Sequence, residues 1–324
     1  MSFPTPVQSF IGGVGLSLPV HALLILNGDV FGISGFVHRA VLGRKEPAFA
    51  VFGLILGGAF IGLLEGHGPS PFPHGISRVV LSGLLVGLGS KTFSSLVATL
   101  TFFVTGVITV QLLPSKLPHA DIMDWSLGPN GRALLGTQIA VSALLGSLAR
   151  HFFIHAGHEI HRVFVQVIAS RPPAKAVSAP QKYQSILRSL VVLATGFEFA
   201  LALRFSNLSE STRVLSFLSL PLSHSFDPSL AFLAAGALPA SIVLYQFFRG
   251  SEQPLLGGRW SIPKGNPIDM KLIGGASLFG IGWGLAGICP GPGLVNLGRA
   301  MTGGSGILPV ATWLFGVTIG GLLV

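Results

Sequence analysis

The chain has 324 residues, of which 50% are hydrophobic and only 10% are charged, and its formal charge at pH 7 is +9. A soluble domain carries about 25% charged residues, so this composition excludes an ordinary soluble protein and indicates a polytopic membrane protein. Cytoplasmic loops rich in Lys and Arg explain the basic excess better than nucleic-acid binding, because the basic residues do not gather on a soluble-looking segment. The single cysteine, Cys289, excludes an internal disulfide framework and a zinc–cysteine cluster.

Apolar segments without charged residues recur along the whole chain, each near or above the ~20 residues that a spanning helix needs. They cover residues 1–28, 47–64, 92–115, 133–149, 228–248, 272–298 and 300–324. We therefore predict an all-α polytopic membrane protein with roughly nine transmembrane helices in two related halves, with broken or re-entrant helices among them.

The first apolar segment ends in a run punctuated by glycines, Gly28-Asp29-Val30-Phe31-Gly32-Ile33-Ser34-Gly35. Such a run is too irregular to continue a straight helix. It forms either a re-entrant turn or an interfacial loop that caps the first helix.

Lys91 is the only charged residue in the stretch 79–113. A lysine in the middle of an apolar stretch is costly in lipid unless it snorkels or faces water, so a tight turn is expected near residues 90–94. Alignment of this region with the second half of the chain pairs Gly83 with Gly280 and Gly87 with Gly284. This weak match suggests that the two halves are related.

The strongest topological signal lies in residues 150–188, where six Lys or Arg residues accompany one acid, Glu159. Such an excess predicts a cytoplasmic linker between a first membrane half, residues 1–149, and a second, residues 189–324. The linker histidines have helical spacing, but no carboxylate cage accompanies them, so we favour an amphipathic helix at the interface over a metal or proton site. Two loop histidines, His67 and His74, have no third ligand at the usual spacing, and no metal site is expected.

Glu198 lies inside the apolar segment 189–203, where an acid is rare and normally faces the interior of the helix bundle. It is a candidate for proton coupling or for a structural partnership. Arg204 lies on a different helical face and cannot be assumed to neutralise it. A helix displaced by one turn would instead place Glu198 near the interface.

The only cysteine stands where a helix is expected to break. Glycines at Gly280, Gly284 and Gly287 permit close helix contact before it. Pro290 and Pro292 then lack amide donors and disfavour a helical conformation in the residues before them. In a membrane, such a break is tolerated only where it is packed in protein or lines a wet cavity, as in transporters built from discontinuous helices.

Three consecutive motifs in the second half resemble a known family. They are Phe226–Phe232, Ile268–Gly275 and the glycine-rich stretch Leu278–Pro292. In order and spacing they resemble the YeeE/YedE sulphur-transport family, bacterial inner-membrane proteins that import thiosulfate, with related members in fungi. Residues 28–35 and 95–103 are also similar to this family, so the resemblance covers most of the chain except the basic linker.

The chain departs from the family pattern in its first half. Family members carry a Cys-Thr-Ser-Gly-His segment there, whereas this chain passes directly from Lys91 to Thr92. Transport in the family is thought to hand thiosulfate along several thiols, and only Cys289 can be carried over.

The resemblance implies a membrane transporter that passes thiosulfate or a related small sulphur-containing anion by the Cys-Pro-Gly-Pro break, with no cofactor. The implied substrate-binding residues are Cys289, Pro290, Gly291, Pro292, Gly287, Gly32, Ser34, Gly35, Thr92 and Ser94, with Glu198 as the candidate for coupling. The expected partners are thiosulfate and the lipid bilayer, and no nucleic acid. The expected location is a plasma membrane, with an internal membrane as the alternative.

Two other functions remain open at this point. The absence of the Cys-Thr-Ser-Gly-His segment, which would carry a second thiol, also fits a non-transporting or impaired paralogue. An enzyme that accepts a sulphane sulphur on Cys289 would need a thiolate, yet no Lys, Arg or His stands near Cys289 in the sequence to stabilise one. We therefore expect a protein that is not an enzyme.

Overall fold

A computed structural model of the chain describes residues 4–90, 96–113, 117, 123–128, 130–168, 181–220, 223–249, 253–257, 259–262 and 268–324. Within these residues the chain forms helices and no β-strand. The helices are α1 (Pro6–Asn27), α2 (Ile33–Val41), α3 (Lys45–Glu65), α4 (Ile76–Gly89), α5 (Leu96–Leu112), α6 (Gly131–Ile168), α7 (Gln181–Phe205), α8 (Ser211–Leu218), α9 (Ser229–Phe248), α10 (Met270–Ala286), α11 (Pro290–Gly303) and α12 (Ile307–Leu322).

Six helical segments are long and apolar enough to cross a membrane: Pro6–Asn27, Lys45–Glu65, Gly131–Phe152, Gln184–Phe205, Ser229–Phe248 and Met270–Gly303. Three shorter apolar helices accompany them, α4, α5 and α12. The protein is therefore an all-α, multi-pass integral membrane protein, as the composition predicts.

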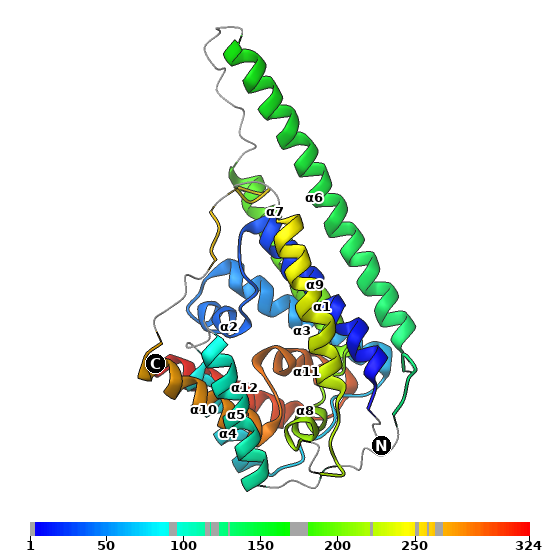
Figure 1. Cartoon of the computed structure of the whole chain (residues 1–324), viewed down its shortest axis with the longest axis vertical. Coiled ribbons are helices and arrows are strands. Elements are labelled where there is room, and N and C mark those ends of the chain that lie inside the picture. Colours follow the sequence, from blue (N-terminus) through cyan, green and yellow to red (C-terminus); the bar gives the residue numbers. More distant parts are fainter. Residues whose placement is uncertain are drawn as a thin grey trace.

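The most extensive helix contacts join the two predicted halves. The helix α1 packs against α9 and α7, and α3 packs against α7 and α11. The helix α10 packs against α4 and α5, and α4 also packs against α12. Figure 1 shows α1 and α9 side by side near the centre of the molecule. The apolar core lies between α7, α8 and the α10–α11 connection, where Phe205, Leu215 and Ile288 are fully buried.

The glycine pairs aligned in the sequence occupy equivalent positions. Side chains at Gly83 and Gly87 of α4 would collide with α12, and side chains at Gly280 and Gly284 of α10 would collide with α5. Thus α4 relates to α12 as α10 relates to α5, and the α1–α9 contact has its equivalent in α7–α3. These reciprocal contacts agree with two related halves. Only α11 lacks an equivalent in the described part of the first half.

The helix α6 continues without a break from the predicted last span of the first half into the predicted linker. Figure 1 shows its upper end projecting beyond the packed helices. The predicted boundary at residue 149 therefore falls inside one helix. The division into 1–149, 150–188 and 189–324 stays a prediction, since residues 169–180 lie outside the described part of the chain.

Candidate functional site

A cavity of about 660 Å³ lies where the segment before α2 meets the connection between α10 and α11. Both predicted halves contribute to its lining, which consists of Asp29, Val30, Phe31, Gly32, Ile33, Ser34, Gly35, Arg39, Ser90, Phe102, Phe199, Leu203, Leu208, Ser261, Phe279, Cys289, Pro290, Gly291 and Pro292.

The break between α10 and α11 places Cys289 at this cavity. The helix α10 ends at Ala286, and the next residue, Gly287, adopts a left-handed conformation (φ 68°) and donates its N–H to the Trp283 carbonyl at 2.7 Å. Glycine suits this position because a side chain there would be strained and would collide with Ser211. Cys289 is then extended (φ −106°, ψ 165°), and α11 begins at Pro290. The predicted break is therefore present, with the thiol at the residue that precedes the new helix.

The start of α11 faces the cavity with few amide donors. Pro290 and Pro292 have no N–H, and the Gly293 N–H bonds the Cys289 carbonyl at 2.9 Å. Among the first three residues of α11, only Gly291 therefore carries an amide hydrogen. This residue packs against Ile33 at the start of α2, because a side chain on Gly291 would collide with the Ile33 side chain.

The start of α2 lies at the same cavity. Gly32 precedes the helix, and no side chain caps its first turn. The amides of Ile33, Ser34 and Gly35 belong to that uncapped turn, and all three residues line the cavity. Helix starts carry partial positive charge and bind anions through such amides. Two helix starts and one thiol thus meet at one cavity.

Aromatic side chains and one arginine complete the walls. The rings of Phe31 and Phe199 stack with centroids 4.6 Å apart, and those of Phe102 and Phe279 lie edge to face at 5.7 Å. Apolar walls strengthen the electrostatic effect of the helix starts. Arg39 extends from α2, and its Nε donates to the Gly35 carbonyl at 3.1 Å.

Serine and aspartate side chains add polar groups to the cavity. The Ser90 hydroxyl donates to the Gly87 carbonyl at 2.8 Å and lies 2.8 Å from Nε2 of the buried His38. Because Ser90 has only one hydroxyl hydrogen, the His38 ring is the donor in that second contact. Asp29 lies 3.8 Å from Arg188 at the beginning of α7.

The predicted site residues are brought together in large part. Cys289, Pro290, Gly291, Pro292, Gly32, Ser34 and Gly35 all line the cavity. Gly287 is not among the lining residues and instead follows the end of α10, against Ser211. Thr92 and Ser94 lie outside the described residues. Glu198 lies away from the cavity, fully buried between α7 and α6, where Ser142 donates a hydrogen bond to it.

Sequence reasoning missed three polar lining residues. The sequence assigned no role to Arg39, and Ser261 belongs to a loop without a motif. Asp29 stands within the glycine-rich run and could have been found there. The Ser261 N–H donates to the Gly28 carbonyl at 2.7 Å, a contact across the chain that local spacing cannot reveal.

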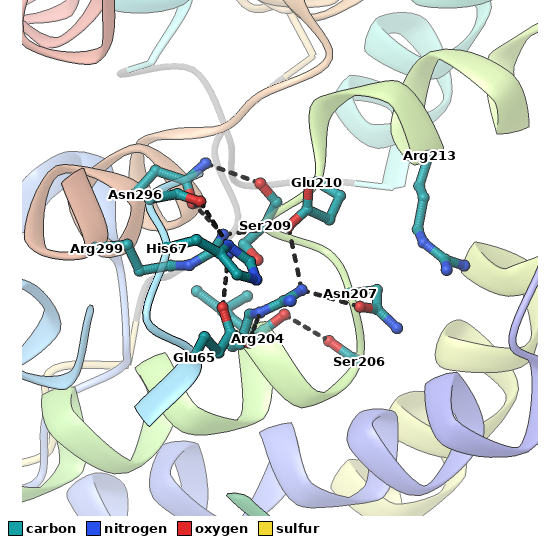
Figure 2. Close-up of polar contacts among 12 residues, drawn as sticks. Glu65, His67, Arg204, Ser206, Asn207, Ser209, Glu210, Arg213, Asn296 and Arg299 are labelled. Atoms are coloured by element: carbon teal, nitrogen blue, oxygen red, sulfur yellow. Dashed lines mark hydrogen bonds and ion pairs between the residues drawn. The ribbon is translucent and has the colours of Figure 1, made fainter. Parts of the chain in front are cut away.

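A buried ion-pair network lies outside the lining of this cavity. Figure 2 shows the side chains of Arg204 and Arg299 converging on Glu65 and Glu210. Arg204 lies 2.5 Å from Glu65 and 3.1 Å from Glu210, and Arg299 lies 2.8 Å and 3.1 Å from the same two carboxylates. Burial alone would raise the pKa of Glu210, but Arg204 and Arg299 hold this pKa below its usual value. The four charges cancel, which makes their burial tolerable.

This network holds a turn that lines two cavities. Leu203 and Leu208 line the large cavity, whereas Arg204 and Asn207 line a smaller one of about 200 Å³. None of these four residues lines both cavities. The turn at residues 203–208 therefore contributes side chains to both cavities.

Comparison with known proteins links the second half of the chain to a family. Residues 187–323 match a family described as a family of unknown function (DUF6691). A protein of Xylella fastidiosa strain Temecula1 / ATCC 700964 named "Probable transporter" is 36% identical over 137 residues, which are 42% of this chain and 90% of that protein. Another of that name, from strain 9a5c, is 36% identical over 133 residues, 41% of this chain and 89% of that protein. The chain belongs to the family of these two proteins. No solved structure matches it.

The DUF6691 match contains one wall of the cavity but not the other. Cys289 and the start of α11 fall within residues 187–323, as do Arg204, Glu210 and Arg299. The start of α2 and Glu65 lie before the matched residues. The cavity and the ion-pair network therefore both join the DUF6691 region to the part of the chain that precedes it.

Proposed function

We propose that this protein is a membrane transporter that carries thiosulfate or a related small sulphur-containing anion through the cavity beside Cys289. Two observations support transport in general. Relatives from Xylella fastidiosa are named probable transporters, and the cavity lies among helices long and apolar enough to span a membrane.

One observation carries the choice of an anion: the starts of α2 and α11 meet at a single cavity. An anion that enters loses hydration, and the amides of Ile33, Ser34, Gly35 and Gly291 can replace part of it. Arg39 adds a full positive charge to the same lining.

The Cys289 thiol supports a sulphur-containing substrate. A thiol is a weak hydrogen-bond donor and a polarisable contact, which suits the terminal sulphur of thiosulfate better than a hard oxygen. The motifs that resemble the YeeE/YedE family, above all Leu278–Pro292, contain this cysteine. No covalent bond to the thiol is required, because the anion only needs to be held and released.

We infer that the turn at residues 203–208 is the barrier between the two cavities and must move for an anion to pass. The ion-pair network holds this turn from one side, and Leu203 and Leu208 cover it from the other. In this proposal the structure corresponds to a closed state of the transporter.

Uptake of labelled thiosulfate into proteoliposomes tests the proposal. The wild type should accumulate label, and an excess of unlabelled thiosulfate should compete more strongly than sulfate, which lacks the terminal sulphur. Cys289→Ala should lower uptake about tenfold, the effect of losing about one hydrogen bond to a charged group. Cys289→Ser should retain more uptake than Cys289→Ala.

A matched control is Ser277→Ala, because the Ser277 hydroxyl bonds only the Ile273 carbonyl of its own helix α10, at 2.9 Å. Full uptake by Cys289→Ala would remove the role of the thiol. An inactive wild type that gains uptake when a Cys-Thr-Ser-Gly-His segment is inserted after Lys91 would identify an impaired paralogue. The absence of an α11 equivalent from the described first half favours that second candidate.

A further inference from the structure

We propose that Glu198, with Ser142 and Gln138, forms a proton-binding site between α7 and α6, and that proton binding there drives transport. The inference rests on the proposed function, since it names the ion coupled to the anion. It concerns a site separate from the cavity beside Cys289.

Glu198 lies in the middle of a membrane-spanning helix with 0% of its surface exposed. The Ser142 hydroxyl donates to its Oε1, and its Oε2 has no hydrogen-bond partner among the described residues. An ionised carboxylate in such a place would be left with one oxygen unsolvated, which costs several kcal/mol. A protonated carboxylic acid avoids this cost.

Gln138 of α6 is a second buried polar group without a hydrogen-bond partner among the described residues. It is 2% exposed, and neither its Oε1 nor its Nε2 has a partner among the described residues. It lies four residues before Ser142 on the same face of α6, so the two side chains begin about 6 Å apart. It packs against Gly15 of α1, where a side chain would collide with the Gln138 amide. Ser142 thus donates to Glu198 on α7 and has Gln138 one helical turn away on α6.

No cation neutralises Glu198 among the described side chains. Among the side chains that the structure describes, the helices packed against α7 carry these titratable or charged groups: His21 of α1, Lys45, Glu46 and Glu65 of α3, Arg132, Arg150 and His151 of α6, and Arg299 of α11. His21 lines a cavity against α9.

The arginines of α7 and α11 have other partners. Arg188 pairs with Asp29 and Glu46, and Arg204 and Arg299 both pair with Glu65 and Glu210. Glu198 therefore gains its neutrality from a proton rather than from a salt bridge. Release of that proton leaves a buried negative charge, which favours a separation of α6 from α7 that admits water.

Infrared difference spectroscopy tests the proton directly. The wild type at neutral pH should show the carbonyl stretch of a protonated carboxylic acid, shifted in heavy water, and Glu198→Gln should lack this band. Ser142→Ala should move the band, because it removes the hydrogen bond to Oε1. A spectrum of the wild type without the band would overturn the proposal whether or not the protein transports thiosulfate.

Proteoliposomes then separate coupling from transport. Thiosulfate counterflow, measured without a pH gradient, reports anion transport alone. The rate of thiosulfate uptake with an acidic exterior reports coupling to protons. The wild type should show both, with several-fold faster uptake under the pH gradient and no change when sodium is replaced by potassium. Glu198→Gln should keep counterflow and lose the response to pH. Ser147→Ala, an exposed serine on α6 bonded to its own helix, is the matched control.

The outcomes distinguish the two proposals. Absent counterflow in the wild type contradicts the proposed function. Counterflow with a pH response that survives in Glu198→Gln contradicts the proton site, and a response that requires sodium assigns the coupling to a metal ion instead. If Glu198→Gln does not fold, Gln138→Leu provides the same comparison, with a weakened pH response expected and an unchanged one counting against the site.

Discussion

The two predicted halves of the molecule have equivalent contacts among four helices each, but they differ in one connection between these helices. In the second half, residues 287–306 lead from α10 to α12 and include the whole of α11. In the first half, only residues 90–95 separate α4 from α5. The cavity is therefore asymmetric: the second half contributes a helix start after a break, and the first half contributes the start of α2.

The same difference leaves one surface covered and its equivalent bare. The helix α11 covers one face of α3, where Gly58 and Gly62 permit close contact. The helix α9 occupies the position equivalent to α3, and it exposes Leu238 at 64% and Ile242 at 60%. Lipid is the natural cover for such a face. The two predicted halves therefore keep equivalent contacts although the second contains a helix, α11, without an equivalent in the described part of the first.

The largest expected effect comes from the network that joins the halves. Arg299→Met should lower the free energy of unfolding by about 3–5 kcal/mol, because Glu65 and Glu210 would share only Arg204 in a buried site. Thermal unfolding in detergent measures this loss. Arg249→Met, at the exposed end of α9, should unfold like the wild type. Equal unfolding midpoints for both variants would show that the network does not hold the halves together.

A glycine substitution tests the covered and the bare faces directly. Gly58→Leu should lower the free energy of unfolding by about 3 kcal/mol, because the new side chain would collide with the Val295 carbonyl of α11. Ala235→Leu, on the exposed face of α9, should change it by less than about 0.5 kcal/mol. A large loss in Ala235→Leu would mean that the face of α9 is packed rather than bare.

Stability should also depend on pH through Glu210. Its pKa is lower in the folded protein than in the unfolded chain, so its contribution is present above the ordinary pKa of a glutamate, about 4.3. This contribution is lost as pH falls through the lowered pKa of the folded state. Unfolding midpoints of the wild type should therefore fall below about pH 4. Glu210→Gln should be less stable at neutral pH and should show a shallower fall in acid.

The smallest expected effect concerns the first-half wall of the cavity. Ser90→Ala should reduce thiosulfate uptake about fivefold, because it removes the neutral hydrogen bond from His38 that fixes the end of α4 beside the cavity. Most of this change should be in KM. A loss of uptake as large as that of Cys289→Ala would show that the Ser90 side and the Cys289 side of the cavity contribute equally to transport. Ser277→Ala again serves as the control.

Local chemistry made part of this arrangement predictable. Pro290 and Pro292 favour a helix break through their own backbone chemistry, independently of distant contacts. Gly287 can adopt the left-handed conformation that follows the end of α10. The paired glycines of α4 and α10 predicted their equivalent contacts because close helix packing requires small residues.

Contacts between distant residues were not predictable in the same way. Arg299 and Glu65 are 234 positions apart, and only the packing of α3 against α11 brings them together. Whether Glu198 faces the interior of the bundle depends on where α6 packs, because Ser142 of α6 donates a hydrogen bond to it. The sequence around Glu198 does not contain that information. The meeting of α2 with α11 was expected only through the family resemblance, since no local spacing encodes it.

The reciprocal packing of the halves also sets an order for biogenesis. The helices α1, α3 and α4 leave the ribosome before α7, α9 and α12 exist, yet those later helices are their principal partners. Until then, Gly53 of α3 has no α7 to contact, and Glu65 has no arginine. A newly inserted first half must therefore wait in the bilayer as a loosely associated set of helices, exposed to membrane proteases and insertion factors. Synthesis of the chain through α12 ends this vulnerable interval.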